Sequence, residues 1–163
     1  MTPTPTAPDN QLPDEQAALI GRISSKWALV ELKMSFLLGT ILEIEPNVSS
    51  AILFTVNSNK VRRDIIQNVA TNALTDDTFQ NQIKSLLRRI GKAAKKRNDL
   101  LHALWLHIPE FGTFQFTSTA LQPLSGKPVT LDQLKRLYDQ IEALTNDLTL
   151  LSVRLSHAKK SSS

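Results

Sequence analysis

Apolar residues along the first third of the chain recur with the spacing of a buried helix. Between Asp14 and Glu45 they keep a seven-residue repeat in two interleaved series. The series are Ile20, Trp27, Met34 and Ile41, and Ile23, Val30, Leu37 and Ile44. This spacing is typical of a helix packed in a bundle or coiled coil. Pro13 and Pro46 flank the segment and suit helix boundaries, so one long helix is expected over residues 14–45.

The same periodicity predicts four further helices. We expect them over residues 47–56, 59–74, 76–102 and 130–158. The last begins at Thr130, where the sequence Thr-Leu-Asp-Gln forms a capping box. Between the fourth and fifth helices, β-forming residues flank a Pro-Glu-Phe-Gly turn and predict a small hairpin over residues 105–108 and 113–117. Residues 124–128 are expected to form a loop.

The expected fold is therefore all-α, an antiparallel bundle of four to five helices with a small β-hairpin after the fourth. Four of the eight prolines lie in residues 1–13, which we expect to be a flexible tail. Residues 14–158 are expected to form a single domain and residues 159–163 a disordered tail. The composition, 41% hydrophobic and 21% charged over 163 residues, is ordinary for one globular domain.

Several classes of protein do not fit the composition. The chain has no cysteine, so disulfides, thiolate nucleophiles and zinc–thiolate sites are excluded. No apolar run approaches the roughly 18 residues of a membrane span, and the N-terminus lacks the features of a signal peptide. A cytoplasmic protein that does not contact a membrane is expected. Neither a Gly-rich phosphate loop nor an H-E-x-x-H sequence occurs, and we expect no metal and no cofactor.

The fourth predicted helix carries an arginine in the middle of its apolar face. At about 100° per residue, Arg97 lies within about 40° of six apolar positions on that face. These are Phe79, Ile83, Leu86, Ile90, Leu101 and Leu104. A buried guanidinium needs a partner. His102 lies about 140° further round, so Arg97 and His102 do not meet on one ligand atom of an ideal helix. Either the helix ends near His102 and the imidazole swings, or a second copy of the chain supplies the missing half across a dimer interface.

Glu31 lies within the apolar arc of the first helix, so we expect its carboxylate to be partly buried. A buried carboxylate and a buried guanidinium are natural partners, and our hypothesis is that Glu31 pairs with Arg97 and fixes its orientation. The alternative is that Glu31 reaches solvent at the edge of the seam.

Basic residues are concentrated on the fourth helix, although the net charge of the chain is only +4. Seven lie between positions 84 and 97, with no acidic residue among them. Lys84, Arg88 and Lys95 form a stripe toward His102 that is predicted to bind RNA. The alternative is a solvated helix face without a ligand. A weaker candidate for phosphate contact lies at the start of the third helix, in Lys60, Arg62 and Arg63, where exposed cations without a function are the simpler interpretation.

Residues 97–102, Arg-Asn-Asp-Leu-Leu-His, resemble the R-x4-6-H motif of the HEPN superfamily. The all-helical layout and the long first helix with Trp27 and Glu31 extend the resemblance to the architecture of residues 14–158. The match in sequence is confined to the six residues. The resemblance implies a metal-independent ribonuclease that leaves 2′,3′-cyclic phosphate ends and assembles its site from two motif copies in a homodimer. Non-catalytic members also exist, so an interaction or nucleotide-binding module is the alternative.

Three of the polar motif residues, Arg97, Asn98 and His102, suit phosphodiester cleavage. Histidine gains and loses a proton near neutral pH, so His102 can act as general base or acid. Arg97 offers permanently charged donors to phosphate oxygens, and Asn98 can orient the histidine or bind phosphate. RNA brings its own nucleophile, the 2′-OH. We therefore expect an endoribonuclease of the toxin or phage-defence kind, with RNA, a second copy and an antitoxin as partners. The alternative for Arg97 and His102 is a structural network between helices.

Overall fold

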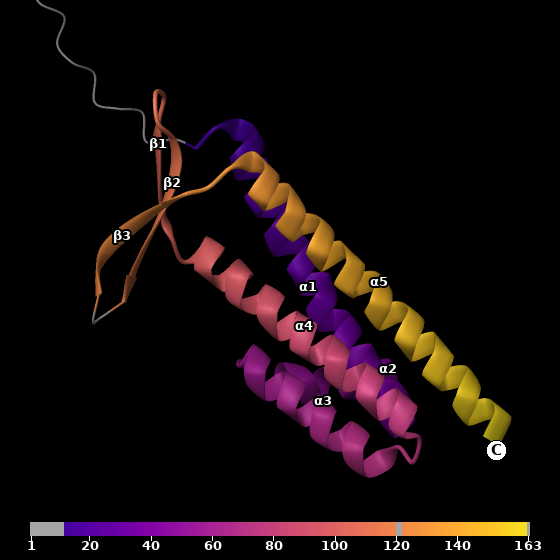
Figure 1. The fold of residues 1–163 in the computed structure, drawn as a ribbon. Coiled ribbons are helices and arrows are strands. Elements are labelled where there is room, and N and C mark those ends of the chain that lie inside the picture. Colours follow the sequence, from indigo (N-terminus) through magenta and orange to yellow (C-terminus); the bar gives the residue numbers. More distant parts are fainter. Residues whose placement is uncertain (1–11, 120–121, 163) are drawn as a thin grey trace, which may run out of the picture.

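The computed structural model describes residues 12–119 and 122–162, which form five helices and three strands (Figure 1). The elements in chain order are α1 (Asp14–Leu42), α2 (Pro46–Phe54), α3 (Asn59–Ala73), α4 (Asp77–Leu101), β1 (Leu104–Ile108), β2 (Gly112–Thr119), β3 (Gln122–Pro128) and α5 (Leu131–Ser162). A mostly helical fold with a small sheet between α4 and α5 is confirmed. No helix in the described ranges is long and apolar enough to cross a membrane.

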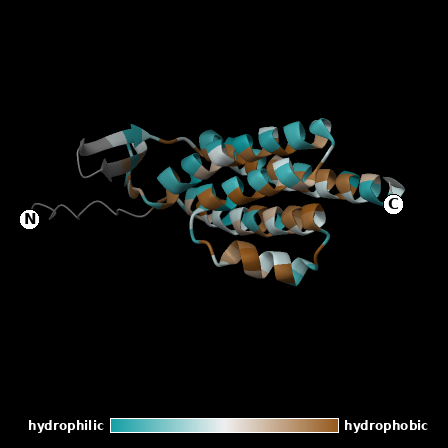
Figure 2. Ribbon diagram, turned by 90° about the horizontal axis from the view of Figure 1, so that it is seen from below, coloured by the Kyte–Doolittle hydropathy of each residue, from teal (hydrophilic) through white to brown (hydrophobic). Residues whose placement is uncertain are grey.

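Helices α1, α4 and α5 build the core of the bundle. α1 and α5 run in the same direction, as ion pairs at both ends show, and α4 runs antiparallel to them (Figure 1). The predicted heptad positions within α1 are buried, apart from the half-buried Ile20, and Ile44, which follows the end of α1, is half-buried as well. Each fully buried Leu or Ile contributes about 1.5–3 kcal/mol to folding. Figure 2 shows hydrophobic and hydrophilic residues alternating along the helices, as expected when each buries one face.

Polar side chains fix where the helices begin. Asp76 accepts a hydrogen bond from the backbone N of Thr78 at 2.7 Å before α4, and this bond lowers the pKa of Asp76. Thr130 and Gln133 form the predicted capping box of α5. α1 ends three residues earlier than expected, because Glu43 adopts a left-handed conformation with φ of 58°.

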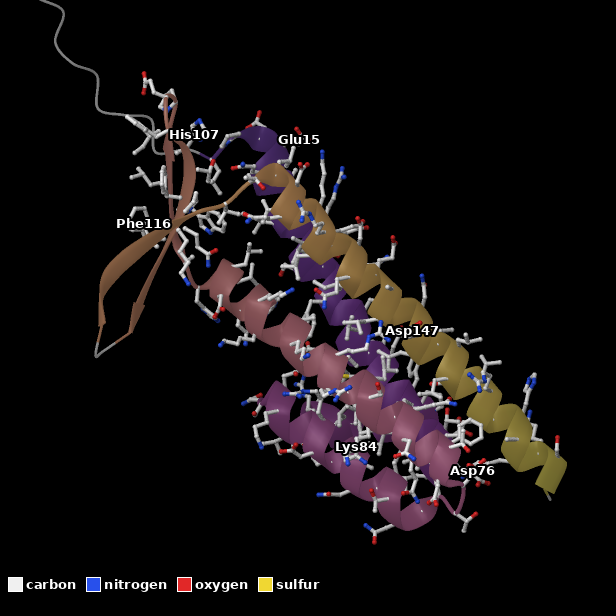
Figure 3. The ribbon with its side chains drawn as sticks, viewed as in Figure 1. Glu15, Asp76, Lys84, His107, Phe116 and Asp147 are labelled. Atoms are coloured by element: carbon white, nitrogen blue, oxygen red, sulfur yellow. The ribbon has the colours of Figure 1, made fainter. Side chains whose placement is uncertain are left out.

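The sheet has one strand more than the sequence predicted. The predicted hairpin is confirmed as β1 and β2, but β3 pairs antiparallel with β2 where a loop was expected. Its Ser, Gly and Pro residues favour loops, and only pairing in the folded chain overrides that preference. A Cβ at Gly126 would lie 2.6 Å from the ring of Phe116, so glycine lets the two strands approach (Figure 3).

The disordered tail expected at residues 159–163 is wrong for residues 159–162, because α5 continues through Ser162. Lys159 explains the extension: its Nζ donates to the Ile41 carbonyl at 2.8 Å and contacts Glu43 Oε1 at 2.6 Å. These contacts tie the end of α5 to the end of α1. The flexible tail predicted for residues 1–13 lies almost entirely outside the described residues.

Candidate functional site

The candidate site begins at the C-terminal end of α4, which stops close to His102 as the sequence predicted. His102 caps the helix, and its backbone N donates to the Asn98 carbonyl at 3.0 Å. The chain then turns into β1, where Trp105 Nε1 donates to the Leu100 carbonyl at 3.2 Å. The His102 side chain is exposed. Leu104, predicted to continue the apolar helix face, is 65% exposed because it belongs to β1.

A cavity of about 540 Å³ lies where α1, the start of α3 and the last turns of α4 meet. Its lining comprises Trp27, Glu31, Asn57, Ser58, Asn59, Lys60, Arg63, Gly91, Ala94, Lys95, Arg97, Asn98 and Asp99. We call it the α4 cavity. Three motif residues, Arg97, Asn98 and Asp99, therefore share one cavity. His102 does not line it.

Arg97 is half-buried and lacks a carboxylate partner. Its Nη1 donates to Asn98 Oδ1 at 3.1 Å, but its Nε is buried and makes no hydrogen bond. None of the ion pairs within residues 12–119 and 122–162 involves Arg97. Removing a cation from water without a partner is costly. The guanidinium is therefore placed to receive an anion in the cavity.

The predicted pairing of Glu31 with Arg97 is wrong. Glu31 instead binds Arg62, with Nη1 and Oε1 3.0 Å apart, and its side chain is 25% exposed, partly buried as expected. Arg62 is buried, donates from Nε to the Val56 carbonyl at 2.6 Å, and stacks 4.9 Å from the centre of the Phe54 ring. The partner of Glu31 thus comes from α3. A helical wheel of α1 alone does not show it. The pair holds the start of α3 against α1.

Arg63 reaches the same cavity across α4. Its Nε donates to Asn59 Oδ1 at 3.1 Å, and its Nη1 lies 3.5 Å from the Leu87 carbonyl. The guanidinium rests over Gly91, where an added Cβ would overlap Nη1 and lie 2.8 Å from Cζ. A glycine within a helix costs about 1 kcal/mol relative to alanine, so this one has a reason in packing. Asn59 Nδ2 is also buried without a partner.

The charges around the α4 cavity are mainly positive. Arg63, Lys95 and Arg97 make no ion pair within the described parts of the chain. Lys60 is paired with Asp64 at 2.6 Å, and the lining carboxylate of Glu31 is neutralised by Arg62. Asp99 is therefore the single carboxylate in this lining that has no cationic partner within the described parts of the chain. Several cationic side chains without a carboxylate partner around one space suit an anion with several oxygens, such as phosphate.

The predicted basic stripe is only partly gathered at this site. Lys95 lines the α4 cavity, whereas Lys84 and Arg88 are exposed on α4 and line none of it (Figure 3). Arg89, beside them, binds Asp147 at 2.7 Å and is thereby held against α5. Lys60 and Arg63, which were the weaker candidates for phosphate contact, line the cavity. The isolated Gly91 in a basic helix was the signal that a side chain packs across it.

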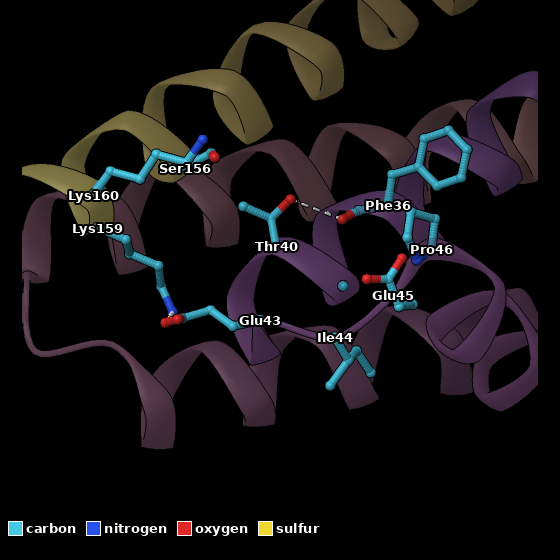
Figure 4. A pocket seen from close by; sticks show the side chains of 10 residues that line it. Phe36, Thr40, Glu43, Ile44, Glu45, Pro46, Ser156, Lys159 and Lys160 are labelled. Carbon is cyan, nitrogen blue, oxygen red and sulfur yellow. Dashed lines mark hydrogen bonds and ion pairs between the residues drawn. The ribbon is translucent and has the colours of Figure 1, made fainter. Parts of the chain in front are cut away.

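A larger cavity of about 740 Å³ lies at the other end of the bundle, between the ends of α1 and α5 (Figure 4). Its charged groups are mixed: two glutamates, Glu43 and Glu45, and two lysines, Lys159 and Lys160, line it, and Lys159 is bound to Glu43. Its charges thus balance one another, and it contains no motif residue. Among the residues that the structure describes, no three His, Cys, Asp or Glu side chains are grouped as a metal site would need.

Comparison of the chain with protein-family models, with curated proteins and with solved structures finds no match.

Proposed function

We propose that this protein is a metal-independent endoribonuclease of the toxin or defence kind, acting as a homodimer. The observation that carries the proposal is the unpaired guanidinium of Arg97 in a cationic cavity. Its buried Nε has no partner, and Asn98, Arg63 and Lys95 lie in the same lining. An RNA phosphate would supply the missing negative charge and accept hydrogen bonds from several of these groups at once.

The proposed reaction is an attack of the ribose 2′-oxygen on the adjacent phosphorus. The imidazole of His102 takes the 2′-OH proton, and the bond from phosphorus to the 5′-oxygen breaks. The imidazolium so formed gives that proton to the leaving 5′-oxygen. The products are a 2′,3′-cyclic phosphate and a 5′-hydroxyl. Arg97 stabilises the negative charge that grows on the phosphate oxygens in the transition state.

In the proposed dimer, a second copy of the chain brings the two groups together. Within one copy, Arg97 points into the α4 cavity while His102 is exposed beyond the helix end. A two-fold dimer that packs the ends of α4 against each other would carry His102 of one copy to the cavity of the other. Leu104, 65% exposed two residues after His102, offers apolar surface for that contact. The site would then join Arg97 of one copy and His102 of the other.

The test is cleavage of transfer RNA by the purified protein in EDTA, with the product ends analysed. We expect wild type to release fragments with cyclic phosphate ends, and His102→Ala to bind the RNA without cleaving it. His157→Ala is the matched control, since His157 lies near the far end of α5, and it should cleave like wild type. Cleavage by His102→Ala at the wild-type rate would contradict the proposal.

A second candidate function is a nucleotide- or RNA-binding module that does not cleave. It is favoured by one observation, that His102 does not line the cavity that contains Arg97. The same assay separates the two functions. A folded, dimeric wild type that binds RNA through Arg97 and leaves it intact would be such a module.

A further inference from the structure

A second cationic cavity lies on the other side of α4. It measures about 600 Å³ and is bounded by α4, by the end of β3 and by the first turns of α5. Lys96, Lys127 and Arg136 line it. None of the three makes an ion pair within residues 12–119 and 122–162, and Asp99 is the single carboxylate in the lining described. We call it the hairpin cavity.

The hairpin cavity is more than a patch of cations. Its lining is partly apolar, with the exposed Pro128 and the half-buried Val129 beside the buried Leu100, Leu134 and Leu137. Amide side chains also line it, and Lys96 Nζ donates to one of them, Gln140 Oε1, at 3.3 Å. Apolar surface suits a base, amides suit its edge, and cations suit the attached phosphate. This combination fits a nucleotide better than a bare anion.

The two cavities adjoin at the last turns of α4. Asp99 lines both of them, and the neighbouring residues Lys95 and Lys96 line one each. Gln115 Nε2 donates to the Asp99 carbonyl at 2.6 Å, so β2 is fixed to α4 beside the hairpin cavity. Figure 1 shows α4 lying between α3 and α5, with its C-terminal end toward the sheet. His102 caps that end of α4, shortly after Asp99.

We propose that the hairpin cavity binds a second nucleotide of the RNA strand whose phosphate Arg97 holds. This inference rests on the proposed function and adds its substrate class, single-stranded RNA that crosses the last turn of α4. An unpaired strand can place a base against the apolar part of the lining, whereas the bases of a duplex are stacked and paired. The strand would run from the α4 cavity past His102 to Lys127 and Arg136.

The test compares how tightly two variants bind single-stranded RNA of about eight nucleotides, a length within the usual range for single-strand sites. A 2′-O-methyl backbone removes the attacking hydroxyl, so binding is measured without cleavage. The variant Lys127→Gln with Arg136→Gln removes two charges from the hairpin cavity. The matched control, Arg22→Gln with Arg154→Gln, removes two exposed charges that line neither cavity. All four side chains are on the surface, and thermal melting checks that both variants fold.

We expect the hairpin-cavity variant to bind the strand about tenfold more weakly than the control. Two lost phosphate contacts should reduce the slope of log K against log salt by about 1.4. Equal affinity and slope in the two variants would overturn the inference. Cleavage in EDTA is scored separately. If wild type cleaves RNA and the two variants bind the strand equally well, only the second nucleotide site is refuted. If wild type does not cleave RNA and the two variants differ in affinity, only the ribonuclease is refuted.

Discussion

Two arginines of this protein occupy opposite electrostatic environments. Arg62 is buried, and its guanidinium binds the Glu31 carboxylate and the Val56 carbonyl. Arg97 is half-buried and binds Asn98, but no carboxylate in the described parts of the chain. The first charge is balanced within the fold, whereas the second is balanced only if something binds. Their substitutions should therefore separate stability from function.

We predict that Arg62→Gln lowers the free energy of unfolding by about 2 kcal/mol, because it leaves a partly buried carboxylate unpaired. Arg97→Gln should leave stability unchanged or raise it, since it removes a buried donor without a partner, and should reduce RNA binding at least tenfold. Urea unfolding and fluorescence anisotropy with a 2′-O-methyl strand measure the two effects. A stability loss in Arg97→Gln as large as that in Arg62→Gln would indicate a structural role for Arg97.

Gly91 allows a second prediction at this scale. Gly91→Ala should keep or slightly raise the melting temperature, since alanine favours helix by roughly 0.5–1 kcal/mol over glycine. The added methyl group would also displace the guanidinium of Arg63, so RNA binding should fall several-fold. Gly21→Ala on α1 is the matched control, because nothing lies within 4 Å of the Cβ it would add. If both variants bind RNA like wild type, Arg63 has no part in the site.

The sequence identified only some of these residues. Arg97 stood out because a cation on an apolar helix face breaks a one-dimensional pattern. Arg63 did not, because its role depends on α3 lying across α4 at Gly91. The partner of Glu31 was predicted wrongly for the same reason: periodicity gives the face on which a residue lies, but not which helix packs against that face.

At the scale of elements, the sheet is attached to the bundle by a short chain of hydrogen bonds. Thr113 Oγ1 donates to Gln16 Oε1 at 2.7 Å and lies 2.9 Å from His107 Nδ1 (Figure 3). A hydroxyl has one proton, so His107 Nδ1 donates in this pair. Gln115 adds the bond to the Asp99 carbonyl. β1 and β2 are thus fixed to α1 and α4, which sets where His102 leaves the helix.

We predict that Thr113→Val loosens the sheet without unfolding the bundle. Losing the buried hydroxyl should cost about 1–2 kcal/mol, because Gln16 loses a donor and His107 an acceptor. Hydrogen exchange should accelerate in β1 and β2 and stay unchanged in α5. Thr149→Val, which removes only a bond to the Thr145 carbonyl within α5, controls for the loss of a hydroxyl. Equal protection of the sheet in both variants would mean that the hydrogen-bond chain does not anchor it.

Helices were easier to predict than strands in this chain. Apolar spacing gave all five helices, because a buried stripe repeats over many residues and caps such as Thr130 with Gln133 mark the ends. β3 was missed, because its stability comes from pairing with β2. The end of α5 was missed because its contact with Glu43 is formed by residues more than a hundred positions apart.

At the scale of the whole molecule, the proposed site is incomplete in one copy. The fold places Arg97 in a cavity between α1, α3 and α4, and leaves His102 outside it at the junction with the sheet. The sequence already indicated this separation, because the two residues lie about 140° apart on an ideal helix. Nothing in one sequence gives the surface on which two copies meet. The proposed mechanism therefore depends most on whether two copies share the site.

The most direct test is to mix subunits that carry Arg97→Ala with subunits that carry His102→Ala, and to measure RNA cleavage in EDTA. Each variant alone should be inactive. Random pairing in a two-fold dimer leaves one intact site in half of the dimers, so the mixture should regain about a quarter of the wild-type rate. If the mixture stays as inactive as its components while wild type cleaves RNA, the site is not assembled from Arg97 of one copy and His102 of the other.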